Sequence, residues 1–125
     1  MPIINSSTAP KFNIIEGLTV TGLAAPSRGS RETCVWKLTL APQTLGTPHA
    51  VGREEIFVVL AGHGAATLGG ETFDLAPGDA LIVPAEQSFS LANPGAEPFE
   101  LVAVLPVGGL ATIPGGAPFA PPWTV

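Results

Sequence analysis

The chain has 125 residues, enough for one compact domain with a real core and too few for two domains of ordinary size. Its net charge is −5 and its five basic residues form no run that could follow a phosphate backbone, which argues against a nucleic-acid partner. Charged residues make up only 12% of the chain, against roughly 25% in a typical soluble domain. We therefore expect apolar surface to be hidden in a homodimer or a larger assembly.

The single cysteine, Cys34, excludes an intrachain disulfide, and no basic segment followed by an apolar one comes after Met1. Both observations favour a cytoplasmic protein. The stretch 101–125 carries no charge, but its five prolines would break a helix that crossed a bilayer. We therefore expect no contact with a membrane.

Glycines and prolines are spread along the whole chain, which favours short strands joined by turns over long helices. The segment 33–40 alternates, with Cys34, Trp36 and Leu38 on one face, as in a half-buried strand. The segment 55–61 is almost continuously apolar and should form a central strand. The full set of predicted strands is 12–15, 18–23, 33–40, 55–61, 65–68, 72–75, 80–83, 89–92 and 99–105.

This spacing of short strands and turns predicts an all-β sandwich or barrel that takes up residues 1–125 as one domain. The terminal segments 1–10 and 114–125 are expected to be extended. Phe119 and Trp123 stand among prolines near the end of the chain. We expect this tail to lie across the barrel surface or a neighbouring subunit, with disorder as the alternative.

Two spaced patterns stand out between residues 46 and 93. The first reads H-x-H, three or four residues, E, six residues, G, and the second reads G, five residues, P-x-G, two residues, H, three residues, N. The residues that match these patterns are His49, Glu55, Gly62, Gly78, Pro84 and Asn93. With them the chain resembles the cupin superfamily over the motif core 46–93. The resemblance implies a small antiparallel jelly-roll β-barrel (a double-stranded β-helix) around an interior pocket.

Four positions depart from the family pattern. Val51 and Phe89 stand where the pattern has two metal-binding histidines, and Gln43 and Glu86 replace two glycines. A catalytic metal site generally needs three or more protein ligands. If a metal binds, His49 and Glu55 would be its ligands, but His63 would lie about 26 Å further along the strand. We expect a degenerate metal site and no cofactor.

The resemblance places His49 and Glu55 on the interior face of the barrel. Strand alternation adds apolar neighbours to them, which suggests a pocket for a small organic ligand. The predicted pocket-lining residues are Val51, Phe57, Val59, Phe89 and Leu91. Arg53 is a weaker candidate that could bind a carboxylate at the pocket mouth, and a solvated loop arginine is the alternative.

Three interpretations of His49 and Glu55 remain open. They are an acid/base pair for isomerase, cyclase or lyase chemistry, or groups that orient a bound ligand without chemistry, or a pair that satisfies itself inside a filled barrel. Two alternatives to a metal-free small-molecule site also remain. One is a metal-dependent dioxygenase or isomerase, and the other is a non-catalytic structural or regulatory dimer. The sequence does not decide whether the protein is an enzyme.

Overall fold

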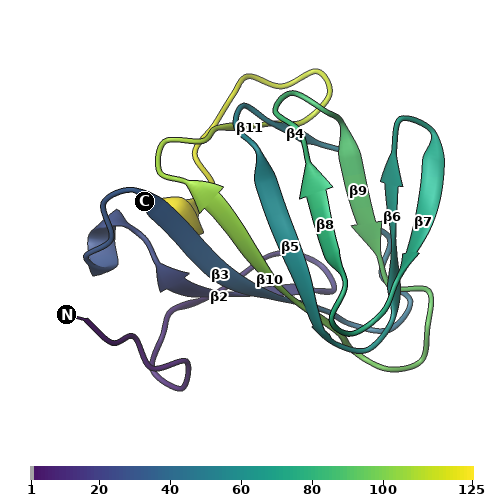
Figure 1. The fold of residues 1–125 in the computed structure, drawn as a ribbon, viewed down its shortest axis with the longest axis horizontal. Coiled ribbons are helices and arrows are strands. Elements are labelled where there is room, and N and C mark those ends of the chain that lie inside the picture. Colours follow the sequence, from purple (N-terminus) through teal and green to yellow (C-terminus); the bar gives the residue numbers. More distant parts are fainter. Residues whose placement is uncertain (1) are drawn as a thin grey trace.

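Two antiparallel sheets face each other in the computed structural model, which describes residues 2–125 (Figure 1). Short 3-10 turns at Pro26–Arg28 (η1) and Pro122–Thr124 (η2) are the helical elements of the described chain. The strands are β1 (Lys11–Ile15), β2 (Leu18–Ala24), β3 (Thr33–Leu40), β4 (Ala50–Val51), β5 (Glu55–Ala61), β6 (Gly64–Leu68), β7 (Glu71–Leu75), β8 (Ala80–Val83), β9 (Phe89–Ala92), β10 (Phe99–Pro106) and β11 (Ala111–Thr112).

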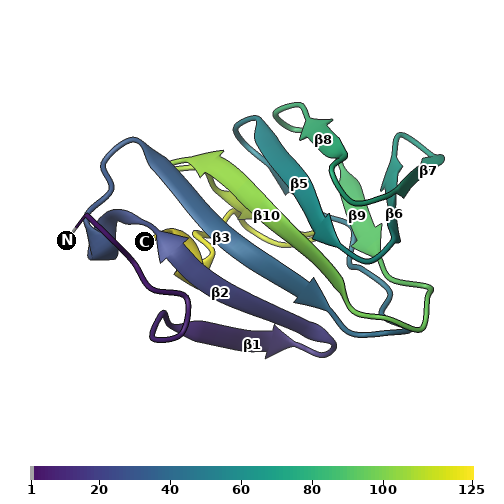
Figure 2. The same cartoon turned by 60° about the horizontal axis from the view of Figure 1, so that its bottom comes forward.

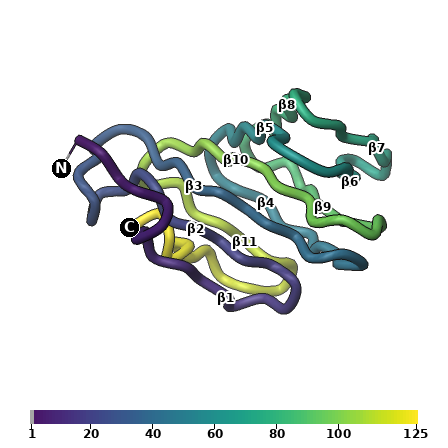
Figure 3. Tube along the Cα trace, turned by 90° about the horizontal axis from the view of Figure 1, so that it is seen from below, coloured from purple at the N-terminus to yellow at the C-terminus, as the bar shows by residue number. Residues whose placement is uncertain are grey.

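The larger sheet has the strand order β1-β2-β3-β10-β5-β8. The opposite wall consists of the pair β11-β4 and the three strands β7-β6-β9. Antiparallel bridges from His49 to Phe89 and from Thr44 to Asn93 join these two groups. The two walls enclose the interior that is seen end-on in Figure 3. The predicted all-β jelly-roll fold is thereby confirmed.

Alternation along the longest strands builds the core. On β10 every second side chain is buried, and Phe99, Leu101, Ala103 and Leu105 are each at most 1% exposed. Strand β10 lies between β3 and β5, so its inner side chains meet partners from both neighbours. Fully burying a side chain of this size stabilises the fold by about 1.5–3 kcal/mol. The core therefore depends mainly on the middle of the larger sheet.

The strand boundaries predicted from the pattern agree closely with the structure. Strands β3, β5, β8 and β9 have the predicted bounds, and the others differ by one residue at an end. The prediction missed β4 and β11, because two residues are too few to show any periodicity. Among residues 2–125, no helix has the length and apolar character needed to cross a membrane.

The terminal segments are less extended than predicted. Residues 6–8 form a turn, in which the amide groups of Thr8 and Ala9 donate to the carbonyl of Asn5. Near the other end, Pro121 and Pro122 lead into η2, and Trp123 is only 9% exposed. Figure 2 shows this yellow segment against β2 and β3, with which η2 is in contact. The tail thus packs into the domain, because its tryptophan is large and apolar.

Asn93 ties the two sheets together. Its side chain is fully buried and its amide nitrogen donates to the carbonyls of Leu40 and Glu97, at 3.0 and 2.8 Å. Its side-chain oxygen accepts a hydrogen bond from the amide of Gly95 at 3.0 Å. The backbone of Asn93 also exchanges two hydrogen bonds with Thr44. All these partners are internal, so the motif asparagine here has a structural role.

The two positions where the motif glycines are replaced keep a glycine-like backbone. Gln43 and Glu86 have φ angles of 61° and 68°, and they are the non-glycine residues with positive φ in the described chain. This left-handed conformation costs a residue with a side chain roughly 1–2 kcal/mol. Gln43 gains compensation because its amide nitrogen donates to the carbonyls of Pro94 and Gly95. The loops of the family pattern therefore persist without their glycines.

Candidate functional site

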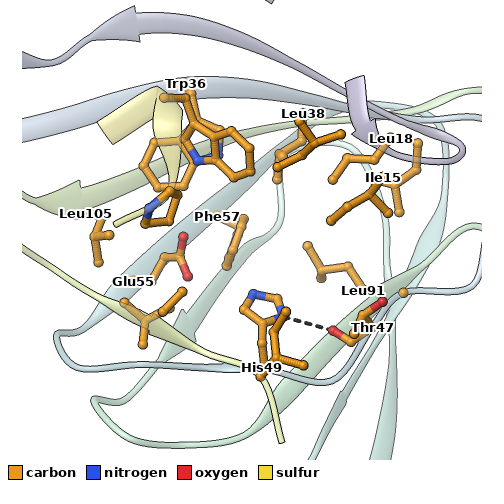
Figure 4. Close-up of a pocket in the computed structure, with 18 of the residues that line it drawn as sticks. Ile15, Leu18, Trp36, Leu38, Thr47, His49, Glu55, Phe57, Leu91 and Leu105 are labelled. Atoms are coloured by element: carbon orange, nitrogen blue, oxygen red, sulfur yellow. Dashed lines mark hydrogen bonds between the residues drawn. The ribbon is translucent and has the colours of Figure 1, made fainter. Parts of the chain in front are cut away.

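A cavity of about 300 Å³ lies between the two sheets (Figure 4). Its walls come from the β1–β2 hairpin, the inner faces of β3, β5 and β10, the loop before β4, and the C-terminal segment. The residues that line it are Ile14, Ile15, Leu18, Trp36, Leu38, Leu40, Thr44, Leu45, Gly46, Thr47, His49, Val51, Glu55, Phe57, Leu91, Leu105, Ala111, Ile113, Phe119, Pro121 and Trp123. The wall is overwhelmingly apolar, and His49 and Glu55 are its ionisable side chains.

Glu55 is the first residue of β5 and points inward because β5 alternates between the interior and the outer face. Its side chain is only 4% exposed, and its Oε1 atom is buried without a hydrogen-bond partner. Desolvation by this burial raises the pKa of the Glu55 carboxyl from 4.5 to about 8. Near neutral pH the group is therefore mostly a neutral acid, which can donate a proton or a hydrogen bond.

His49 lies at the opposite wall, on the segment that leads into β4. Its backbone amide and carbonyl both bond to Phe89, at 3.0 and 2.8 Å, and its ring lies 4.4 Å from the Phe89 ring. The ring Nδ1 is 2.9 Å from the carbonyl of Thr47. Since a carbonyl only accepts hydrogen bonds, Nδ1 carries the proton, and in the neutral ring Nε2 is left as an acceptor.

The two polar side chains do not satisfy each other. Figure 4 shows the Glu55 carboxyl and the His49 ring directed into the same cavity. Both residues are described by the structure, and neither a hydrogen bond nor an ion pair joins them. The interpretation of a self-satisfied pair in a filled barrel therefore does not fit the structure. The separation instead leaves room for a ligand between the two groups.

The structure places the predicted pocket residues in three groups. Val51, Phe57 and Leu91 line the cavity. Phe89 and Val59 are buried but lie outside its lining: Phe89 packs behind His49 and Phe57, and Val59 lies further along β5. The cavity is restricted to the Glu55 end of β5, which alternation alone cannot show.

Arg53 is exposed and does not line the cavity, so the structure places it as a solvated loop residue. His63 is exposed in the turn after β5 and is also absent from the lining. Neither residue brings a positive charge to the ligand. A carboxylate bound in the cavity would therefore lose its hydration without gaining a cationic partner.

Sequence reasoning missed the aromatic residues of the cavity wall. Trp36 was placed on a buried face without a ligand role, and Phe119 and Trp123 were placed on the surface. In the structure the Trp36 and Trp123 rings are 6.2 Å apart, and both line the cavity. The Trp123 indole nitrogen is buried without a partner. The signal available in advance was the pair of large aromatics in an otherwise proline-rich tail.

Arg28 and Cys34 hold this aromatic wall in position. Arg28 donates to the carbonyls of Leu23 and Trp123, at 2.7 and 3.3 Å. The buried Cys34 thiol donates to the carbonyl of Thr124 at 3.4 Å. Burial raises the pKa of this thiol, so the cysteine acts here as a packed, uncharged group.

The residues present do not fit the metal ion that is typical of the family pattern. Val51 is buried and apolar at one ligand position, and Phe89 fills another. Across residues 2–125, no three His, Cys, Asp or Glu side chains come together as a metal-binding group. His49 and Glu55 would be two ligands without a third.

The model of the cupin domain matches residues 36–105, which include the cavity strands β3, β5, β9 and β10. The chain belongs to the cupin family. Auxin-binding protein 5 of Zea mays is 33% identical to this cupin over 84 residues, which is 67% of this chain and 54% of the maize protein. The cupin thus spans about half the length of this curated relative.

Solved cupin structures share the fold at low sequence identity. The polyketide cyclase RemF of Streptomyces resistomycificus aligns with a TM-score of 0.78 at 18% identity, over 87% of this chain and 81% of that one. An RmlC-like cupin of Shewanella frigidimarina gives 0.74 at 18% identity, over 85% and 90%. Salicylate 1,2-dioxygenase of Pseudoaminobacter salicylatoxidans gives 0.71 at 21% identity, over 83% and 31%. At these identities the likeness establishes the fold alone.

The burial of Glu55 predicts a pH-dependent stability. The folded state holds the carboxyl proton up to a pKa of about 8, whereas the unfolded state releases it near 4.5. The stability contributed by this proton is therefore fully present below the unfolded pKa and is lost as the pH rises toward the folded one. Relative to Glu55→Gln, the free energy of unfolding of the wild type should fall by about 3–4 kcal/mol between pH 5 and pH 8.

Urea denaturation at a series of pH values measures this difference. Glu54→Gln is the matched control, because Glu54 is the exposed neighbour of Glu55. The control should follow the wild-type pH dependence. Identical pH dependences for wild type and Glu55→Gln would show that Glu55 ionises as an ordinary surface carboxylate.

Proposed function

We propose that this cupin binds a small, neutral and largely apolar organic molecule in the cavity between its sheets, without a bound metal. The observation that carries the proposal is the buried Glu55 carboxyl, whose Oε1 has no partner and which lies in an otherwise apolar wall of a cavity of about 300 Å³. A buried polar atom usually has a hydrogen-bond partner, so a ligand group is the natural complement. The cavity volume is at the lower end of the range for small-molecule sites.

The charge of the cavity supports a neutral ligand. Glu55 is the deeply buried ionisable group in the wall, and its raised pKa keeps it mostly protonated near neutral pH. An anionic ligand would face this acid with no arginine or lysine in the lining. A carbonyl or hydroxyl oxygen, by contrast, can accept the Glu55 hydrogen bond at little desolvation cost.

The entrance also suits an apolar molecule. Leu45 is 85% exposed, and the β1 residue Ile14 is 63% exposed, although both belong to the cavity lining. Exposed apolar residues grouped around a concave opening are typical of ligand-binding sites. The aromatic rings of Trp36 and Trp123 offer flat surfaces further inside.

Acid/base catalysis of an isomerase, cyclase or lyase type is a second candidate function. It is favoured by the opposed roles of the two polar groups, because Glu55 is a proton donor and Nε2 of His49 is a proton acceptor. With a ketone between them, Glu55 would protonate the carbonyl oxygen while His49 removes a proton from the adjacent carbon. The product of that step is the enol, and the reverse step restores the ketone.

The names of two similar proteins match these two classes, one a binding protein and the other a cyclase. Neither likeness transfers an activity, because the first covers part of the relative and the second rests on 18% identity. The choice therefore depends on the site itself and on three experiments.

The first experiment concerns metal. We predict that protein incubated with Mn, Fe, Co, Ni, Cu or Zn ions and then desalted retains far less than one metal ion per chain. The reason is that His49 and Glu55 supply two ligands where stable sites use three or four. Elemental analysis measures the content. Stoichiometric metal that disappears in His49→Ala would instead indicate a metal-dependent cupin.

The second experiment concerns ligand class. We predict that 2-acetylnaphthalene, a neutral aromatic ketone, binds more tightly than 2-naphthoate, its anionic counterpart, at neutral pH. Replacing Glu55 by Leu should weaken ketone binding about 2- to 10-fold, the value of one neutral hydrogen bond. Isothermal titration calorimetry measures both affinities. Tighter binding of 2-naphthoate would contradict the proposed ligand class, and Glu54→Leu is the control for the substitution.

The third experiment separates catalysis from binding. If the pair is catalytic, the methyl protons of 2-acetylnaphthalene should exchange with deuterium from solvent faster in the presence of the wild-type protein. Glu55→Gln and His49→Gln should each lower this rate at least tenfold, since general acid–base catalysis contributes about 10²–10⁴-fold. Proton NMR follows the exchange. Ketone binding without accelerated exchange would assign the site to binding alone.

A further inference from the structure

The outer face of the larger sheet is unusually apolar for a surface. Strands β5 and β10 carry apolar side chains on both of their faces, whereas an antiparallel strand with one solvated face normally alternates apolar and polar residues. Their inner side chains form the core. Their outer side chains face away from the cavity, and within residues 2–125 no helix or loop crosses them (Figures 1 and 3).

The strand register brings these outer side chains together in rows. Val35 on β3 is paired with Val104 on β10, which is paired with Ile56 on β5, which is paired with Ile82 on β8. All four are apolar and belong to the outward-facing set of their strands. The row therefore crosses four neighbouring strands without a polar interruption.

A second row lies beside the first. It runs from Lys37 through Val102 and Val58 to Ala80. Leu60, which is 50% exposed, follows Val58 on the same face of β5. We call the two rows together with Leu60 the outer apolar face. Ile82 is 59% exposed and marks its other margin.

The charges at the edge of this face cancel within one chain. Lys37 Nζ lies 2.7 Å from Glu100 Oε1, and each side chain is about one third exposed. When two identical faces meet across a two-fold axis, each charge of one face meets the same surface of the other, so unpaired like charges would repel. Here the two charges are already neutralised, and the centre of the face carries none.

We infer that the outer apolar face is the contact surface of a homodimer, in which a second copy of this chain packs its own β3-β10-β5-β8 face against the first. Four strands spaced about 4.8 Å apart and eight residues long cover a flat footprint of about 500 Å². Accessible area over protruding side chains exceeds a flat footprint, so the face approaches the roughly 800 Å² that each partner of a stable interface buries. Two flat sheet faces of the same sequence pack well because their side chains interdigitate in an aligned sandwich.

The surface also accounts for the low charge content of the chain. A copy of the same chain is the partner that this composition favours, because the face is apolar, uncharged at its centre and identical on both sides of a two-fold axis. The inferred surface lies on the opposite side of β5 from the cavity. Ligand binding and dimer formation can therefore be tested separately.

Sedimentation equilibrium of the full chain tests the inference. The wild type should sediment at twice the chain mass of 12.7 kDa, and Ile82→Lys should sediment at the single-chain mass. Leu60→Lys is a second variant with the same expected result, at another exposed position of the face. Ile82→Val should remain a dimer because it keeps the apolar surface. Circular dichroism shows whether each variant retains its β structure.

Phe73→Lys is the matched control for the added charge. Phe73 is 45% exposed on β7, outside the outer apolar face, so this variant should remain a dimer. A wild-type chain at 12.7 kDa would overturn the inference and leave a different macromolecule as the occupant of the face. A dimer that persists in folded Ile82→Lys and Leu60→Lys would overturn it as well, because the contact would then lie elsewhere.

Discussion

The inward alternation of β5 and β10 is the constraint on which the rest of the structure depends. In a strand, neighbouring side chains point to opposite faces, so one register decision places Glu55 and Phe57 inside and Ile56 and Val58 outside. A shift of one residue would bring Ile56 to the cavity and expose the Glu55 carboxyl to water. The register is held by the pairing of β5 with β10 on one side and β8 on the other.

The same constraint explains the chemistry of the cavity. An apolar barrel interior is a poor solvent for charge, and Glu55 is held there by the strand that carries it. The carboxyl responds by retaining its proton to a pKa of about 8. The loss of two metal-ligand positions to Val51 and Phe89 acts in the same direction, since both replacements make the interior more apolar. The site thus combines a neutral acid, an imidazole and a hydrophobic wall.

The cavity is also a product of the chain ends and the first hairpin. Bonds from Arg28 and Cys34 to the tail backbone bring Trp123 against the inner side of β2 and β3. The bridge between Ala111 and Phe119 adds a second attachment of the tail. The cupin motifs supply the two polar groups, while segments outside the motifs supply much of the apolar wall. Ligand selectivity in this chain should therefore depend on residues that the family pattern does not contain.

The sequence by itself determined the strands, the family and the two polar groups of the site. These could be predicted because alternation, turn residues and motif spacing are local properties of the chain, as the agreement at β3 and β5 shows. Only the tertiary structure decided which inward residues border a cavity and which fill the barrel. Val59 and Phe57 share a face of β5, yet Phe57 alone reaches the cavity. The position of Trp123 and the isolation of Glu55 from His49 depend equally on contacts between distant segments, which no local pattern records.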